Sequence, residues 1–296
     1  MDPLLSPRSV ADAIGVSESS LKRWADEGLL RVSRTAGGHR RIALHEALRY
    51  IREAGIPIVR PEALGLPQLP PEASSHVAVN ERDAFLIDNV QRGEPFGART
   101  ALLSRYLGGE SMASLCDGPL REALHNVGEL WHHGPEGIHI EHRAVDVCVH
   151  ALHYVRGFLA TPVEGASLAL GGGAAGDPYI VPSLMAATVL AAEGWREINL
   201  GPNVPAAALT AAIRKFRPRL IWMSFSTQQA AEAALCEMKE PVELAGKLGA
   251  SFIAGGRCAP PRGLLAPASF HLLPSMEALV GFARGLTAAQ PAAEQP

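Results

Sequence analysis

The stretch Ser167-Leu168-Ala169-Leu170-Gly171-Gly172-Gly173 predicts the fold of the C-terminal part of the chain. An apolar run that ends in glycines is typical of a buried strand. Three more strands are predicted downstream, at residues 196–200, 220–224 and 251–256. The segments between them predict helices at 180–193, 206–216 and 232–248, the last interrupted near Pro241. Strands that alternate with helices favour a doubly wound α/β domain with a parallel sheet.

One edge of this sheet is the expected place for a ligand, because ligands bind beyond the carboxyl ends of parallel strands. Small and polar residues gather at those ends, at 171–177, 202–204, 224–227 and 255–257. Several such strand ends in one domain leave room for a flat or extended ligand.

The segment before the sheet predicts a bundle of four helices. Apolar residues recur at near-helical spacing, and short connections separate the stretches 80–91, 96–106, 111–131 and 141–159. Pro119 is expected to interrupt the third of these helices near its start. Helices with short connections favour a bundle.

Residues 130–142, Leu-Trp-His-His-Gly-Pro-Glu-Gly-Ile-His-Ile-Glu-His, hold four of the eleven histidines of the chain. The Gly134-Pro135 pair predicts that one helix ends near Trp131 and that another begins near Glu141. One interpretation is a polar surface loop between two helices. The other is part of a ligand pocket, because helix ends can direct side chains into a cavity.

The N-terminal segment has the pattern of two short helices joined by a glycine turn. Ser6 and Ser17 can cap helices, and Gly15 separates them. A hairpin at 29–42 follows, and residues 43–53 predict a closing helix. Residues 31–41 contain four arginines, His39 and no acidic residue. Such a local basic patch favours phosphate contact, although a small helical domain with a solvated loop is the alternative.

A proline-rich segment separates the N-terminal part from the bundle. It contains five prolines between residues 57 and 71. Proline at this density predicts an extended, semi-rigid spacer that packs little. The expected organisation is therefore a winged helix-turn-helix at 1–56, a linker at 57–77, a helical bundle at 78–162, an α/β domain at 163–285 and a flexible tail at 286–296.

Composition limits the class of protein. The chain has 296 residues, of which 47% are hydrophobic and 19% charged, and its net charge is -3. This charge argues against a globally basic nucleic-acid binder, so any nucleic-acid contact must be local. No apolar run is long enough to span a bilayer, and no signal peptide is expected at the start. Four scattered cysteines without a C-x-x-C pair predict reduced thiols, a cytoplasmic location and no cysteine zinc site.

The N-terminal motifs resemble the winged helix-turn-helix of the MerR family. The resemblance rests on Gly15-Val16-Ser17, Leu21-Lys22-Arg23-Trp24, Gly28-Leu29-Leu30 and Gly37-Gly38-His39-Arg40-Arg41. It implies a recognition helix at residues 19–25 in the major groove of double-stranded operator DNA and a basic wing on the DNA backbone. The implied DNA-contacting residues are Ser19, Lys22, Arg23, Arg34, His39, Arg40 and Arg41, whereas Trp24 is expected in the core.

The C-terminal motifs resemble the cobalamin-binding domain. That family carries Asp-x-His-x-x-Gly, then Ser-x-Leu or a variant, then Gly-Gly. This chain has Asp177-Pro178-Tyr179-Ile180-Val181-Pro182, then Ser224-Phe225-Ser226 after 41 residues, then Gly255-Gly256 after another 28. All three parts in this order resemble the light-sensing, adenosylcobalamin-dependent repressors of the CarH and LitR type. The implied cofactor-binding residues are Trp131, Glu141 and His142 from the bundle, and Asp177, Tyr179, Val204, Ser224, Ser226, Gly255 and Gly256 from the sheet.

The chain departs from that pattern below the cofactor. Tyr179 occupies the position of the histidine that ligates cobalt, and Pro182 replaces the following glycine. A neutral phenol is a poor metal ligand, so His132, which follows Trp131, becomes the metal-ligand candidate. Three hypotheses stay open: cobalamin binds without a lower protein ligand, a different ligand such as another tetrapyrrole binds, or the domain serves only in assembly.

The favoured function is a DNA-binding transcriptional regulator, a repressor, whose oligomeric state and operator affinity respond to a cobalamin-type ligand or to light. A homodimer or tetramer is expected, because one short helix-turn-helix has limited reach. The alternative is a MerR-like regulator that binds another ligand or none and acts through protein contacts as an anti-repressor. An enzyme is not expected, since neither a nucleophile motif nor a substrate barrel is present.

Overall fold

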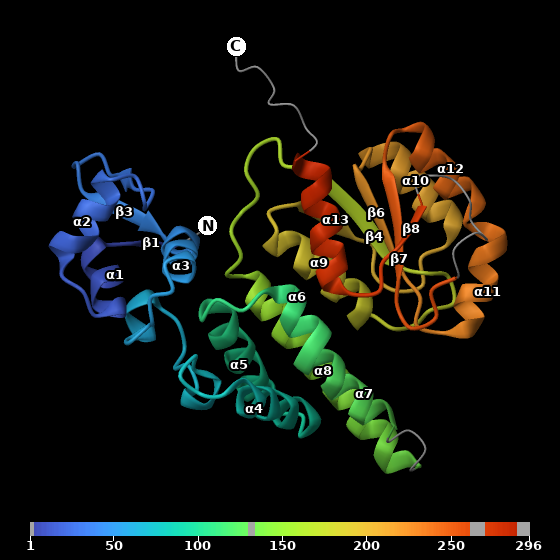
Figure 1. The fold of residues 1–296 in the computed structure, drawn as a ribbon, viewed down its shortest axis with the longest axis horizontal. Coiled ribbons are helices and arrows are strands. Elements are labelled where there is room, and N and C mark those ends of the chain that lie inside the picture. The colour runs from blue at the N-terminus through green and yellow to red at the C-terminus, as the bar shows by residue number, and fades with distance from the viewer. Residues whose placement is uncertain (1–2, 130–133, 261–269, 289–296) are drawn as a thin grey trace. The chain divides into compact units, whose positions relative to one another are not determined.

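The computed structural model describes residues 3–129, 134–260 and 270–288 (Figure 1). The chain divides into two compact units. Unit 1 comprises residues 1–111 and 118–161, and unit 2 comprises residues 112–117 and 162–296. Among the described helices, none combines the length and apolarity that crossing a bilayer requires.

Unit 1 begins with the predicted winged helix-turn-helix. Helices α1 (Pro7–Ile14), α2 (Glu18–Asp26) and α3 (Leu44–Glu53) accompany a small antiparallel sheet. Its strands are β1 (Leu4–Leu5), β2 (Ser33–Arg34) and β3 (Arg40–Ala43), in the order β1-β3-β2. The helix caps are those predicted. The Ser6 hydroxyl accepts from Ser9 N at 3.0 Å, and the Ser17 hydroxyl accepts from Ser20 N at 3.1 Å. Trp24 packs on Tyr50 with ring centroids 5.4 Å apart, as expected for a core residue.

The proline-rich segment differs from the extended spacer that its composition predicts. It contains two 3-10 helices, Pro61–Leu64 and Pro71–Ala73, each with proline in the first turn, where a missing N–H costs nothing. Leu64, Leu66 and Ala73 are buried. Apolar side chains between the prolines thus anchor this segment within unit 1.

The bundle of unit 1 consists of α4 (Val79–Gln91), α5 (Pro95–Leu107), α7 (Arg121–Glu129) and α8 (Pro135–Arg156). One prediction is wrong in detail. Helix α8 begins at Pro135 and not near Glu141, because proline at the first helical position needs no N–H partner. The helix expected at 111–131 is interrupted after α6 (Met112–Leu115) by the π-helical turn Cys116–Leu120, where Gly118 has non-helical dihedrals, and this turn contains the Pro119 that predicted an interruption.

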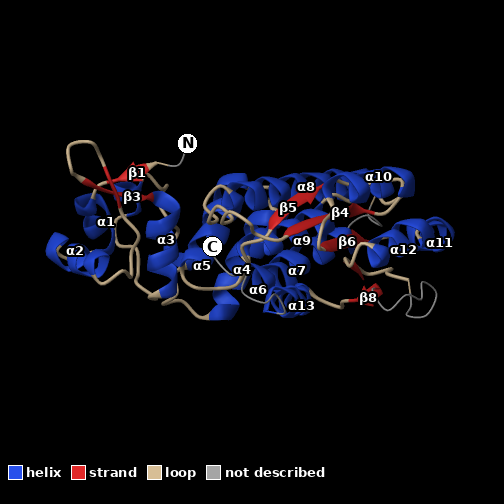
Figure 2. Ribbon diagram, turned by 90° about the horizontal axis from the view of Figure 1, so that it is seen from above, coloured by secondary structure: helices blue, strands red, loops and turns tan. Residues whose placement is uncertain are grey.

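Unit 2 is the predicted doubly wound α/β domain. Its five parallel strands lie in the order β5-β4-β6-β7-β8. Their bounds are β4 (Leu168–Gly173), β5 (Arg196–Asn199), β6 (Leu220–Ser224), β7 (Ser251–Gly255) and β8 (Phe270–Leu272). Figure 2 shows these strands flanked by helices. The order reverses between β4 and β6, and such a switch point is where ligands bind in open α/β sheets.

The helices of unit 2 form two groups. One group is α6, α9 (Val181–Ala192) and α13 (Met276–Ala288), and the other is α10 (Ala206–Phe216), α11 (Gln228–Glu237) and α12 (Lys239–Lys247). The break between α11 and α12 lies at Met238, so the helix is interrupted near Pro241, as predicted. Pro241 is tolerated because it lies in the first turn of α12. The sequence did not predict β8 or α13.

Candidate nucleic-acid interface and ligand edge

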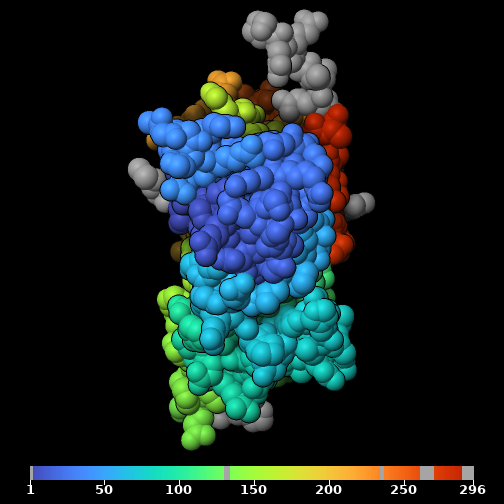
Figure 3. All heavy atoms as spheres, turned by 90° about the vertical axis from the view of Figure 1, so that its left-hand side faces the viewer, coloured from blue at the N-terminus to red at the C-terminus, as the bar shows by residue number. Residues whose placement is uncertain are grey.

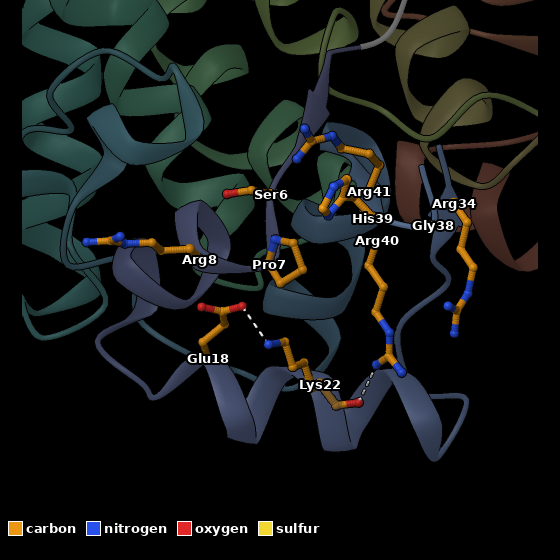
Figure 4. A pocket seen from close by; sticks show the side chains of 10 residues that line it. All are labelled: Ser6, Pro7, Arg8, Glu18, Lys22, Arg34, Gly38, His39, Arg40 and Arg41. Carbon is orange, nitrogen blue, oxygen red and sulfur yellow. Dashed lines mark hydrogen bonds and ion pairs between the residues drawn. The ribbon is translucent and has the colours of Figure 1, made fainter. Parts of the chain in front are cut away.

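A basic groove runs between α1, α2 and the β2–β3 hairpin of unit 1 (Figure 4). It has a volume of about 460 Å³. One carboxylate faces five cationic side chains, so the groove favours an anionic partner. Its lining residues are Ser6, Pro7, Arg8, Glu18, Lys22, Arg34, Gly38, His39, Arg40 and Arg41. Figure 3 shows the surface of these N-terminal residues in blue.

The predicted recognition helix α2 presents exposed polar side chains at Ser19, Lys22 and Arg23. The Lys22 Nζ lies 2.8 Å from a carboxylate oxygen of Glu18, and the Arg23 Nε lies 3.9 Å from one of Glu27. Exposed pairs at this spacing contribute little to stability, because solvent screens the charges and two long side chains must be held in one geometry. Both cations can therefore exchange their carboxylate for a DNA phosphate at little cost.

The predicted wing is the β2–β3 hairpin. Its turn is closed by hydrogen bonds from Thr35 N to His39 O at 2.9 Å and from Gly38 N to Thr35 O at 2.8 Å. Gly38 has a φ of 77°, a conformation that side chains other than glycine rarely adopt. The turn leaves His39 exposed at the tip and Arg34 exposed on β2.

Arg40 differs from the other arginines of the wing because its guanidinium is already engaged. Its Nη2 lies 2.6 Å from Asp26 Oδ1, and its Nη1 donates to the Lys22 carbonyl at 3.1 Å (Figure 4). Both acceptors belong to the C-terminal half of α2. Arg40 therefore ties the wing to the recognition helix, whereas no carboxylate pairs with Arg34 or Arg41 among the described residues.

Asp177 is the centre of the predicted ligand edge in unit 2. Its carboxylate is fully buried. One oxygen accepts from Ser226 N at 2.5 Å and the other from Tyr179 N at 3.1 Å, while its carbonyl accepts from Asn203 N at 2.9 Å. Asp177 thus joins three of the loops that follow the strands.

The remaining predicted residues of unit 2 lie at the same edge. Ser224 and Ser226 are buried, and the Ser226 hydroxyl has no hydrogen-bond partner among the described residues. Gly256 has a φ of 104°, and a Cβ there would lie 2.4 Å from the Phe225 carbonyl oxygen. Val204 is also buried, beside Gly172. The edge therefore offers one buried hydroxyl without a partner and a close backbone approach that only glycine permits.

Of the four bundle residues predicted to contact the cofactor or its metal, the structure describes two. Trp131 and His132 lie outside the described residues. Glu141 and His142 lie on α8, and the His142 Nε2 is 3.4 Å from the Glu141 carboxylate. The Glu141 side chain is 13% exposed and that of His142 is 72% exposed. Among the described residues, no group of three His, Cys, Asp or Glu is arranged to hold a metal.

Comparison with known proteins decides the class of the N-terminal module. Residues 5–43 match the family described as "MerR HTH family regulatory protein". The N-terminal module is a MerR-type helix-turn-helix. The matched residues include α1, α2 and the wing, and with them every residue that lines the basic groove.

Two further similarities extend beyond the MerR module. The chain is 26% identical over 233 residues to the HTH-type transcriptional repressor CarA of Myxococcus xanthus, covering 76% of this chain and 77% of that protein. It is a distant homologue of that repressor. The monomethylamine corrinoid protein of Methanosarcina barkeri superposes with a TM-score of 0.57 at 15% identity, over 71% of this chain and all of that one. The predicted combination of a MerR module with a cobalamin-binding type of fold is confirmed.

The donor set at the ligand edge does not fit a cobalt ligand from the protein. Tyr179 stands where the cobalamin-binding pattern has histidine, and its side chain is 40% exposed. Both oxygens of Asp177 accept from backbone N–H groups, so this carboxylate serves the loops. The glycines and the partnerless Ser226 hydroxyl do fit an extended ligand. Cys148 is unsuited to metal binding, because burial raises the pKa of its thiol to about 12.

The sequence did not indicate one residue of the basic groove, nor the hydrogen bonds that two residues make at the ligand edge. Arg8, on α1 of the MerR module, lines the basic groove and could have been noticed as a cation directly after the Ser6-Pro7 cap. Asn203 accepts from Gly176 N at 2.7 Å with a φ of 52°, and Arg257 donates to the Ser226 carbonyl at 3.2 Å. Both lie within the predicted strand ends 202–204 and 255–257, but local sequence gave no signal for these two hydrogen bonds, because the partners are 27 and 31 residues away.

Proposed function

We propose that the chain is a DNA-binding transcriptional repressor whose assembly and operator affinity are controlled by a ligand of the cobalamin class. The observation that carries the proposal is the basic groove of the MerR module, joined in one chain to a domain with a cobalamin-binding fold. The CarA relative is a transcriptional repressor, which supports the sign of regulation.

In this proposal the MerR module docks α2 in the major groove of DNA. Ser19, Lys22 and Arg23 face the bases and the adjacent phosphates, and Arg34 and Arg41 contact the backbone from the wing. A single module reads few base pairs, so two copies on paired half-sites are required. Control by assembly then follows, because a ligand that binds two assembly states unequally shifts the equilibrium between them.

The ligand edge of unit 2 would hold the cofactor without a protein ligand to cobalt from below. The Ser226 hydroxyl would donate a hydrogen bond to the cofactor. Gly255 and Gly256 would let the tail of the cofactor approach the backbone closely. When bound, adenosylcobalamin supplies a cobalt–carbon bond that light can break. Trp131, His132, Glu141 and His142 remain the predicted contacts from the bundle.

The deciding experiment is an absorption spectrum of the full-length chain after incubation with adenosylcobalamin in the dark and removal of free cofactor. We expect a retained corrinoid spectrum that changes on illumination, together with a change in the electrophoretic shift of the chain's own promoter fragment. A protein that retains no chromophore refutes the cobalamin proposal. A retained but light-stable spectrum keeps the ligand and removes the light response.

A second candidate function is favoured by Tyr179 and Pro182. Pro182 lies in the first turn of α9, immediately after the loop that carries Tyr179. In this alternative, unit 2 binds another tetrapyrrole or no ligand, and the chain acts through protein contacts as an anti-repressor. It predicts no shift of the promoter fragment at any light level, so the same experiment separates the two functions.

A further inference from the structure

The helical bundle of unit 1 contains a second cavity with basic walls. It lies between the beginning of α5 and the middle of α8 and has a volume of about 490 Å³. Two arginines and two histidines face one carboxylate there. The lining side chains that matter are Arg99, Arg143, Asp146, His150, His153 and Tyr154.

Arg99 is held in place by aromatic rings and not by a carboxylate. Its guanidinium carbon lies 5.0 Å from the ring centroids of both Phe96 and Tyr154. Its Nε is buried and has no hydrogen-bond partner, and no carboxylate pairs with it among the described residues. A guanidinium fixed by cation–π contacts keeps both its charge and its N–H donors for a ligand.

The single carboxylate of the cavity is shared. Asp146 Oδ2 lies 3.0 Å from Arg143 Nη1, and Asp146 Oδ1 lies 3.3 Å from His150 Nδ1. The stem of Arg143 passes close to Gly93, where a Cβ would lie 2.5 Å from its Cγ. Two guanidinium groups face one carboxylate, so the cavity is positively charged.

This cavity is distinct from the surface of α8 that carries Glu141. At about 100° per residue, Arg143, Asp146, His150 and Tyr154 lie on one side of the helix. Glu141 lies on the opposite side. A ligand in the cavity therefore does not compete for the side chain assigned to the cofactor.

We propose that the cavity binds a small molecule through a phosphate monoester group. Arg99 donates to the phosphate from the α5 side and Arg143 from the α8 side, and the Tyr154 hydroxyl completes the set of donors. Guanidinium groups match phosphate oxygens in pairs, which favours this anion over a monovalent one. This inference does not depend on the proposed function of unit 2.

The test is calorimetric titration of the full-length chain with glycerol 3-phosphate in a phosphate-free buffer. We expect saturable binding that Arg99→Gln and Arg143→Gln each weaken at least tenfold. Arg214→Gln is the matched control, because Arg214 is an exposed arginine of unit 2 that pairs with Glu240 at 2.9 Å. Its binding is expected to equal that of the unchanged chain, and glycerol alone is not expected to bind.

Three results would overturn the proposal. They are no saturable binding to the unchanged chain, undiminished binding in both cavity variants, or an equal loss in Arg214→Gln. If Arg99→Gln does not fold, as judged by circular dichroism, the half-exposed Arg143 supplies the decisive variant. A fourth result would assign the cavity to nucleic acid and also overturn the proposal. In that case Arg99→Gln lowers the salt dependence of duplex DNA binding, but the same variant binds glycerol 3-phosphate as tightly as the unchanged chain.

Discussion

Neighbouring arginines of the wing differ in what their side chains reach. Arg41 has no carboxylate partner among the described residues, and neither has Arg34, whereas Arg40 bonds to Asp26 and to the Lys22 carbonyl of α2. A free guanidinium adds to DNA affinity through phosphate contact. A bonded one sets the distance between the wing and the recognition helix.

Replacement of Asp26 by alanine distinguishes phosphate contact by Arg40 from positioning of the wing by Arg40, because the two roles predict opposite changes in DNA affinity. If Arg40 positions the wing, Asp26→Ala weakens operator binding, although it removes a negative charge from the interface. We expect that weakening, to be measured by fluorescence anisotropy with labelled DNA at several salt concentrations. Tighter binding by Asp26→Ala would show that Arg40 acts as a phosphate contact instead.

Arg34→Ala and Arg41→Ala are expected to weaken DNA binding uniformly across sequences. Each removes about one phosphate contact, so the slope of log K against log salt should become less steep by about one. The same anisotropy titrations provide the measurement. An unchanged slope in both variants would contradict the assignment of the hairpin as a DNA-contacting wing.

Glu46 links the stability of the MerR module to pH. Its side chain is 6% exposed and accepts from Arg31 N at 2.8 Å and from Arg49 Nη2 at 2.6 Å. Burial alone would raise the pKa of Glu46, but the hydrogen bonds from Arg49 and Arg31 outweigh it, and the pKa is lowered. The stabilisation is therefore present above the unfolded pKa and is lost as pH falls through the folded one.

Glu46→Gln tests this linkage. At neutral pH it should cost about 1–3 kcal/mol, because buried donors lose a charged acceptor. The difference from the unchanged chain should shrink as the pH falls below about 4. Urea unfolding of the chain at a series of pH values measures it, and a difference that stays constant with pH would contradict the argument.

The glycines of β4 allow this strand to lie close to the loop that follows β5. A Cβ at Gly172 would lie 2.7 Å from both Gly201 O and Val204 Cγ2. Gly172→Ala should therefore destabilise unit 2 by about 1–3 kcal/mol through overpacking. Gly281→Ala is the control, because a Cβ at that exposed position of α13 meets no other atom within 4 Å. Helix propensity predicts that it stabilises by about 0.5–1 kcal/mol, as thermal melting would show.

Periodicity and capping were sufficient to predict most elements. Ser6 and Ser17 located α1 and α2, and the apolar run to Gly173 located β4, because these signals are local. Local signals failed where the deciding partner is distant or short. Strand β8 has three residues, too few for a pattern, whereas the break at Cys116–Leu120 did have a local signal in Pro119.

At the candidate sites, too, local features could be predicted from the sequence and long-range contacts could not. Charge counted along residues 31–41 indicated a basic surface, but the sequence could not tell a free Arg41 from an Arg40 bonded to Asp26. Spacing of small residues indicated the ligand edge of unit 2. The role of Asp177 as a bridge to Ser226 depends on a contact across 49 residues, which only the fold reveals.

Helix α6 is part of unit 2, although most of that unit comes much later in the chain. Asp117, just after α6, accepts from Met276 N and Glu277 N, both at 3.0 Å, and so caps α13. Asp117→Ala should destabilise unit 2 by about 0.5–2 kcal/mol while unit 1 is unaffected. Hydrogen exchange followed by mass spectrometry resolves the two units. Faster exchange spread equally over both units would contradict the assignment, and Asp117→Asn, which retains an acceptor, should behave nearly as the unchanged chain.

This capping contact has a consequence for how such chains can be recombined. A chimaera joined at residue 162 would transplant the sheet but leave behind the carboxylate that holds the start of its last helix. A junction placed before Met112 moves α6 and Asp117 together with the sheet, and α7 and α8 must travel with them. The smallest cassette that carries unit 2 intact therefore includes half of the helical bundle, so exchange of unit 2 between related chains necessarily rebuilds the bundle from two parents.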